Sequence, residues 1–158
     1  MSPTLRGLRL ALLVCAGVVL LDQAVKEVVR AEVARGEEIS VLPFLEIANT
    51  RNRGIAFGLA DGASPLLIAA TVAVVVAIFA FLISHLRGPA IWLAGGLLVG
   101  GALGNLADRV RDGAVTDFIA LPLWPTFNLA DVAIVAGVLT LVSFHDGGGN
   151  RDCDERAA

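Results

Sequence analysis

Two aspartates, Asp117 and Asp131, stand fourteen positions apart in an otherwise apolar part of the chain. Asp117 lies in a predicted loop that offers it no helix cap and no obvious charged partner, and Asp131 opens a run of uncharged, mostly apolar residues. Two carboxylates held together at low dielectric cannot both ionise comfortably, so one keeps its proton. Such a pair holds a general acid and a general base, which together can activate water for attack on an amide carbonyl.

Two amides and a guanidinium are spaced to meet these carboxylates. Asn128 precedes Asp131 by three positions, and Asn105 precedes Arg109 by four, so each pair shares one face of a helix. Asn128 and Asp131 are also residue types that cap helix N-termini, and this structural interpretation stays open beside the chemical one.

The composition indicates an integral membrane protein. Of the 158 residues 56% are hydrophobic and 17% charged, and the mean hydropathy is +0.78. With a net charge of −3 and no basic block, nothing in the sequence supports nucleic-acid binding, and we expect no nucleic acid partner. Cys15 and Cys153 lack CxxC spacing, and His85 and His145 are expected at the other membrane face. We therefore predict no metal and no cofactor.

Four apolar segments are candidates for membrane-spanning helices, each of which needs about 20 residues. The two middle segments meet this length, whereas the first and last reach it only if Asp22 and Asp131 are counted inside or at the edge of the helix. Embedded carboxylates of this kind are costly and mark functional sites. We predict spans at about 8–28, 65–86, 88–107 and 128–145.

Four crossings place both chain ends on one side of the membrane and the notable polar residues on the other. The counts of Lys and Arg tie between the two sides once two candidate site residues are set aside, so the positive-inside rule does not orient the chain. The polar residues expected to share one face are Asp22, Lys26, Asn49, Asn52, Asn105, Asp108, Arg109, Asp117, Asn128 and Asp131.

The longest predicted segment outside the membrane, about 29–64, lies between the first two spans. Residues 39–42 and 44–52 partly alternate between apolar and polar and are separated by Pro43, which predicts a small strand layer over the site. The predicted fold class is therefore all-α, with four transmembrane helices and a small β-layer between helices 1 and 2, in a single domain of residues 1–145. The tail, 146–158, is predicted to be disordered.

Several polar residues also have structural interpretations. Asp108 is predicted to form an interfacial ion pair with Arg109 or Arg111. Asp22 and Lys26 lie one turn apart and are equally consistent with an intrahelical ion pair and with a role in the site.

A glycine repeat in the third predicted span indicates close helix packing and no chemistry. Gly96, Gly100 and Gly104 recur every four residues, the pattern that lets membrane helices approach closely.

The N-terminal stretch has two interpretations. A basic start, an apolar run and Cys15 resemble a bacterial lipoprotein signal, but Val14 is larger than such a signal requires and the apolar run continues. An uncleaved first transmembrane helix fits better.

Five motifs together resemble lipoprotein signal peptidase, also called signal peptidase II, a family of bacterial inner-membrane aspartic peptidases. They are spread over about three quarters of the chain, in the order and spacing of the family, and they read LDQAVK, NRGIAFG, GGALGNLADR, AVTDF and FNLAD.

The resemblance implies an endopeptidase that removes signal peptides from diacylglyceryl-modified prolipoproteins and cuts before the lipidated cysteine. It implies that Asp117 and Asp131 are the catalytic dyad. It places the site and the β-layer on the extracytoplasmic side of the bacterial inner membrane, with both termini in the cytoplasm. We expect a monomer that contacts membrane lipid. The residues implied to bind substrate are Asn52, Gly54, Asn105, Arg109 and Asn128, and those implied to support the site are Asp22, Lys26 and Asp108.

Two other classes of protein compete with this interpretation. A small proton-coupled transporter also carries intramembrane carboxylates, but it needs polar groups at several depths, and the other halves of the predicted spans are apolar. A catalytically silent scaffold protein would leave Asp117 unexplained.

Overall fold

The structure, a computed structural model, describes residues 2–53, 65–84 and 89–146. Gly54, His85 and the predicted tail after Asp146 lie outside these residues. The elements, in chain order, are α1 (Pro3–Glu32), β1 (Glu38–Leu42), β2 (Leu45–Asn52), α2 (Pro65–Ser84), α3 (Pro89–Asp112), β3 (Val115–Leu121), β4 (Trp124–Phe127) and α4 (Leu129–Asp146).

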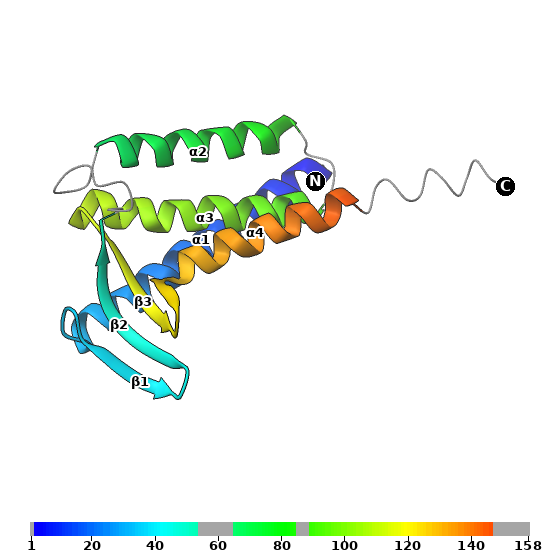
Figure 1. The fold of residues 1–158 in the computed structure, drawn as a ribbon. Coiled ribbons are helices and arrows are strands. Elements are labelled where there is room, and N and C mark those ends of the chain that lie inside the picture. Colours follow the sequence, from blue (N-terminus) through cyan, green and yellow to red (C-terminus); the bar gives the residue numbers. More distant parts are fainter. Residues whose placement is uncertain (1, 54–64, 85–88, 147–158) are drawn as a thin grey trace.

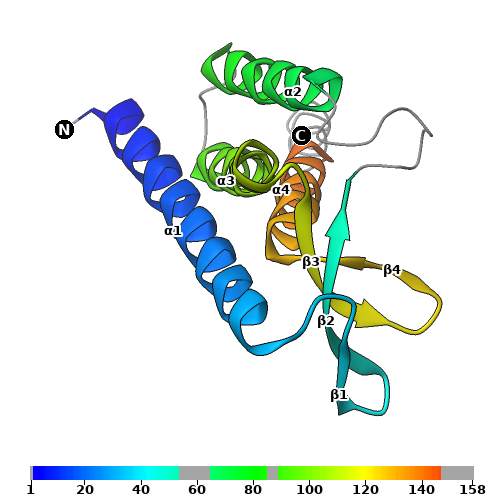
Figure 2. The same ribbon diagram turned by 90° about the vertical axis from the view of Figure 1, so that its left-hand side faces the viewer.

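The helices form a bundle around α3, which packs against α1, α2 and α4 (Figures 1 and 2). α1 begins and α4 ends at one end of the bundle, and the sheet lies at the opposite end (Figure 1). Three of the four described helices begin with proline. The fixed φ of proline suits a first helical turn, and an N–H at that position would form no hydrogen bond within the helix. Ser2 adds a cap to α1, since its Oγ accepts a hydrogen bond from Leu5 N at 3.3 Å.

The predicted helices all exist, with different bounds. α1 continues four residues beyond the predicted 8–28 because the polar segment after Asp22 stays helical, and α3 extends past the predicted 88–107 to Asp112. Within the described residues, two helices are long and apolar enough to cross a membrane, Thr4–Glu32 and Ala90–Asp112. Four membrane spans remain a prediction, because the apolar stretches described in α2 and α4 are shorter.

The glycine stripe on α3 packs against α1, as predicted. A Cβ built on Gly96 would lie 2.7 Å from Ala11 O, and one on Gly100 would lie 3.0 Å from Cys15 O. Only glycine lets the two backbones come this close. Gly101, one position outside the stripe, faces α4 instead, where a Cβ would overlap the carbonyl oxygen of Ala130.

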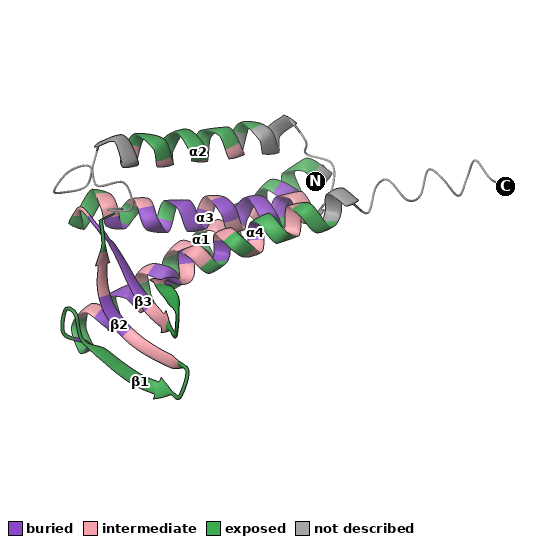
Figure 3. Ribbon diagram, viewed as in Figure 1, coloured by how far each residue is buried: buried purple, intermediate pink, exposed green. Residues whose placement is uncertain are grey.

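The sheet is larger than predicted. The predicted all-α class is therefore wrong, because the helices are accompanied by a four-stranded sheet. The predicted strands between α1 and α2 are present as β1 and β2, but the segment between α3 and α4, which was expected to be a loop, forms β3 and β4. The strand order is β1-β2-β3-β4, antiparallel throughout. The five residues 114–118 are all buried, so β3 lacks the alternation by which a half-buried strand is recognised (Figure 3).

A small apolar core fixes the sheet to the end of α1. Val29 of α1 and Val33, which caps that helix, pack against Phe118 of β3, and Ile47 of β2 and Leu129 of α4 lie around this cluster. Burial of these side chains holds β2 and β3 over the ends of α1 and α3, and so it sets the position of the β3 residues that adjoin Phe118.

Candidate active site

Asn128, directly before α4, and Asp131, in the first turn of α4, form a reciprocal cap. Asn128 Oδ1 accepts a hydrogen bond from Asp131 N at 3.1 Å, and Asp131 Oδ2 accepts one from Asn128 N at 3.2 Å. The predicted capping role is therefore confirmed. A third residue completes the cap from another helix, because Asp22 Oδ1 of α1 accepts from Ala130 N at 3.0 Å. Each of these bonds satisfies a backbone N–H that a helix start leaves free.

Asp117 faces this cap from the middle of β3. Its side chain is 2% exposed, and its residue pairs with Thr50 of β2. Asn128 Nδ2 donates to Asp117 Oδ1 at 2.6 Å, and Asn52 Nδ2, at the end of β2, donates to Asp117 Oδ2 at 3.0 Å. Asn128 thus contacts both aspartates, which brings Asp117 and Asp131 into one site.

Asn105 of α3 joins the same network. Its Nδ2 donates to Asp131 Oδ1 at 2.8 Å, while its Oδ1 accepts from Asn128 Nδ2 at 3.1 Å and from Lys26 Nζ at 3.2 Å. The ammonium group can only donate, so it fixes which end of the Asn105 amide faces Asp131. The predicted meeting of two carboxylates and two amides is confirmed, and Asn52 adds a third amide.

The hydrogen bonds determine where a proton on the dyad can point. Both oxygens of Asp117 and both oxygens of Asp131 accept hydrogen bonds from N–H groups. Such groups cannot accept a proton or a hydrogen bond in return. A carboxylic acid O–H at either aspartate must therefore point to the other carboxylate, to water or to a substrate oxygen.

The electrostatic environments of the two aspartates differ. Burial raises the pKa of Asp117 to about 6, the negative charge of Asp131 acts in the same direction, and the amides of Asn52 and Asn128 oppose it. Asp131 is less buried and lies at the N-terminus of α4, where backbone N–H groups and the helix dipole favour negative charge.

Lys26 is buried completely and has three acceptors for its three N–H groups. Its Nζ lies 2.8 Å from Asp22 Oδ2 and 3.0 Å from Asp108 Oδ2, besides its bond to Asn105. The intrahelical pair of Asp22 and Lys26 is confirmed, and the same lysine also touches the site. The role of this pair in the site stays a prediction.

Asp108 is a correction to the sequence prediction. It pairs with Lys26 and with Arg30 at 2.8 Å, not with Arg109 or Arg111. The reason is its place on α3, one turn after Gly104, so that it points at α1 as the glycine stripe does.

Three residues that the sequence analysis missed complete this cluster. Gln23 Nε2 donates to Asp108 Oδ1 at 3.1 Å, Arg30 Nε donates to Thr116 Oγ1 at 3.0 Å, and Thr116 N donates to Asp108 Oδ2 at 3.0 Å. The spacing of Gln23, Lys26 and Arg30 at three and four positions could have indicated that they share one face of α1.

Arg109, a predicted site residue, and Asn49, which was expected only at the same membrane face, both lie apart from the dyad. Arg109 Nη1 donates to Asn105 O at 3.4 Å, and Arg109 forms no ion pair with any other residue that the structure describes. Asn49 is buried, but its Nδ2 donates to Val33 O at 2.8 Å, so it ties β2 to the end of α1. Gly54 lies outside the described residues.

Comparisons with known proteins match nearly the whole chain. A family described as Signal peptidase (SPase) II matches residues 14–145. The chain is similar to the lipoprotein signal peptidase of Pelotomaculum thermopropionicum, with 40% identity over 82% of this chain and 86% of the relative. It is also similar to that of Chlorobium phaeobacteroides, with 36% identity over 88% and 97%.

Solved structures agree with the sequence comparisons. One, titled a bacterial membrane enzyme structure at 1.9 Å resolution, has a TM-score of 0.78 and 33% identity and covers 84% of this chain and 89% of its own. A second, with a similar title at 2.3 Å resolution, has a TM-score of 0.79 and 31% identity over 89% and 90%. The two long apolar helices among the described residues are consistent with a membrane protein, and by sequence and fold the chain belongs to the signal peptidase II family.

Proposed function

We propose that this protein is an aspartic endopeptidase that removes signal peptides from diacylglyceryl-modified prolipoproteins, with Asp117 and Asp131 as its catalytic pair. Membership of the family supports the reaction. The observation that carries the residue assignment is the position of Asn128, which donates to Asp117 at 2.6 Å and exchanges cap hydrogen bonds with Asp131. One amide thereby holds two carboxylates from separate elements side by side.

We assign the acid to Asp117 and the base to Asp131. Burial favours the protonated form of Asp117, and the start of α4 stabilises negative charge on Asp131. Asp131 removes a proton from water as the water oxygen attacks the amide carbon, while Asp117 donates its proton to the carbonyl oxygen. When the C–N bond breaks, the leaving nitrogen takes the proton from Asp131, and the hydroxyl returns its proton to Asp117.

The remaining residues position these groups. Asn52, Asn105 and Asn128 orient the carboxylates, and Lys26, held by Asp22 and Asp108, orients Asn105. Arg109, and Gly54 outside the described residues, are proposed to bind substrate because they match the motifs of the family. No cofactor and no metal take part in these steps.

The proposed setting is a four-span protein of the bacterial inner membrane, monomeric, with its termini in the cytoplasm and its site near the extracytoplasmic face. The site lies where the helices meet the sheet, at the end opposite the start of α1 (Figure 1). A signal peptide is an apolar helix and diacylglycerol is itself a lipid. The bond to be cut would therefore lie near the membrane surface, at the depth of such a site.

The distribution of buried polar side chains disfavours a transporter. Among the described residues these side chains lie in the second halves of α1 and α3, in β2 and β3, and at the start of α4. A proton pathway needs such groups at several depths, because each proton must be handed across the membrane.

Cleavage of a purified prolipoprotein tests the proposal. The parent protein should release the signal peptide from the diacylglyceryl-modified form, and Asp117→Asn and Asp131→Asn should each lose about 10² to 10⁴-fold in rate. Cys15→Ser, a change remote from the site, is the control and should cleave normally. Cleavage by either aspartate variant at the parent rate would refute the dyad, and a large loss of rate with a chelator would refute the metal-free steps.

A further inference from the structure

Large apolar side chains are exposed at the tips of both hairpins of the sheet. Phe44, in the β1–β2 turn, is 61% exposed, Leu123, in the β3–β4 turn, is 105% exposed, and Trp124, the first residue of β4, is 67% exposed. Aromatic and leucine side chains rarely gather on a water-facing surface unless they bind something. We call these residues, with their neighbours, the hairpin-tip patch: Val41, Leu42, Phe44, Leu123 and Trp124.

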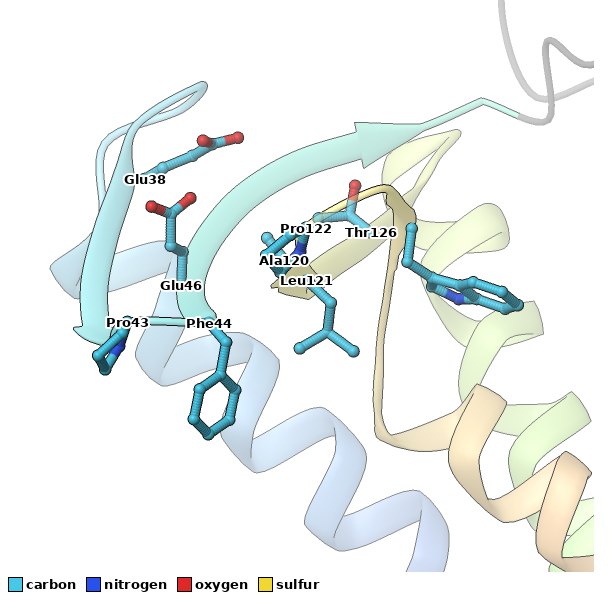
Figure 4. A pocket seen from close by; sticks show the side chains of 9 residues that line it. Glu38, Pro43, Phe44, Glu46, Ala120, Leu121, Pro122 and Thr126 are labelled. Carbon is cyan, nitrogen blue, oxygen red and sulfur yellow. The ribbon is translucent and has the colours of Figure 1, made fainter.

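The two sides of this end of the sheet differ in polarity. Phe44 and Leu121 project toward the side on which α1 and α4 run, whereas the carboxylates of Glu38 and Glu46 project the opposite way (Figure 4). These residues line a hollow of about 390 Å³ between the two hairpins. The acidic side chains therefore point away from the direction in which the apolar helices extend.

The backbone at Leu123 supports an external partner for the patch. Its φ is 63°, the left-handed region that glycine and asparagine adopt at lower cost. A leucine there strains the turn, and because the side chain is fully exposed it gains no compensating contact within the described chain. A contact outside the chain would explain the residue type.

The apolar surface of α1 indicates which partner this is. Leu20, Leu21 and Val28 are exposed along the second half of α1. Both hairpins turn back along the direction of the helices to the level of that half (Figure 1), with their tips to the side of the bundle (Figure 2). A lipid layer that surrounds α1 would continue to the level of the hairpin tips. The patch would therefore lie at the same depth as the exposed apolar surface of α1.

We propose that the hairpin-tip patch is a membrane anchor, which inserts Phe44, Leu123 and Trp124 into the boundary between lipid headgroups and acyl chains. Tryptophan favours this boundary, since its ring is apolar and its N–H can reach water. The patch holds no lysine or arginine. Its binding should therefore depend on apolar insertion and little on anionic lipid. The anchor would hold the sheet against the membrane independently of the chemistry at the aspartates.

Tryptophan fluorescence tests the anchor in the intact protein. The chain has two tryptophans, and Trp92 is buried against Gly7 of α1. The parent and Trp124→Phe are placed in nanodiscs at one copy per disc, with zwitterionic lipid that is either plain or brominated, and the difference between them isolates Trp124. We expect brominated lipid to quench the Trp124 emission several-fold, with aqueous iodide having little effect.

Variants separate insertion from folding. Leu123→Asn relieves the strained φ, so the turn should keep its fold while losing apolar surface, and Phe44→Asp should act likewise at the other turn. Each should reduce quenching by brominated lipid and increase quenching by iodide, with an unchanged circular dichroism spectrum. Replacing part of the zwitterionic lipid by anionic lipid should change neither.

Three results would overturn the proposal. The first is a Trp124 that iodide quenches in nanodiscs and brominated lipid does not. The second is protection of Trp124 only when two copies share a disc, which would assign the patch to a second copy of the chain. The third is protection only after substrate is added, which would assign the patch to the substrate.

Discussion

The two halves of the bundle formed by α1, α3 and α4 are held together by opposite means. Beneath the sheet the contacts are polar, and the largest fully buried side chains of the described chain are Lys26, Asn128, Thr116, Asp22 and Asp108. In the other half, glycines on α3 bring the helix backbones together, with Gly96 against Ala11 and Gly100 against Cys15.

The proposed membrane setting explains this difference. Lipid is as apolar as leucine, so burying leucine between membrane helices gains little, and close backbone contact has to provide the attraction. At the polar end, charges that are buried and fully paired fix one geometry. Gly104 lies where the two halves meet, since a Cβ there would come within 2.8 Å of Asp22 Oδ2. The last glycine of the stripe thus leaves room for the first carboxylate of the site.

Removing one charge from the polar half should have the largest effect on stability. Lys26→Met leaves Asp22 buried without a cation and leaves Asp108 with Arg30 alone, which should cost about 3 to 5 kcal/mol. Arg111→Met is the control, because the ion pair of Arg111 with Glu27 is exposed, and it should leave the unfolding temperature in detergent unchanged. Equal shifts for both variants would show that the buried pairs do not hold the helices together.

Filling the glycine contacts should be the next largest effect. Gly101→Ala places a methyl group on the carbonyl oxygen of Ala130, and overpacking of this kind costs about 1 to 3 kcal/mol. Gly17→Ala is the matched control, since nothing lies within 4 Å of its Cβ position. Thermal unfolding should separate the two. If both glycines tolerate alanine, α3 and α4 do not depend on close approach.

The pH dependence of cleavage probes the polar half without a mutation. The acid must be protonated, and the pKa of Asp117 is raised to about 6. We therefore expect kcat/KM to fall about tenfold per pH unit above pH 6, with the apparent value belonging to the pair. A rate that instead rises with pH up to 8 would exclude Asp117 as the acid.

The same group affects stability in a defined direction. Between pH 4 and 6 the unfolded chain loses the Asp117 proton while the folded chain keeps it, so the contribution of this group to the free energy of unfolding decreases as the pH rises. Asp117→Asn should remove that slope from a pH series of unfolding measurements.

Changing Arg109 should have the smallest effect on stability. Its hydrogen bond to Asn105 O is long, at 3.4 Å, so Arg109→Gln should change the free energy of unfolding by less than about 0.5 kcal/mol. If Arg109 binds substrate, KM should rise while the unfolding temperature stays the same. Unfolding without a change in KM would make Arg109 structural.

The sequence predicted the polar half well because its signals are local. Embedded carboxylates in an apolar chain, and amides at helical spacing beside them, are visible without a structure, and Asp117, Asn128 and Asp131 meet as predicted. β3 escaped prediction because a strand buried on both faces has no alternating pattern. The partners of Asp108 escaped prediction because they lie about 80 positions away on α1, where pairing depends on the facing helix.

A double-mutant cycle tests the central claim most directly, because residues that act as one catalytic unit give losses that do not multiply. The measurement is kcat/KM for signal-peptide release by the parent, Asp117→Asn, Asp131→Asn and the double variant. We predict that each single variant loses about 10² to 10⁴-fold and that the double variant is no slower than the slower single one. Losses that multiply in the double variant, or a single variant that cleaves at the parent rate, would contradict a shared dyad.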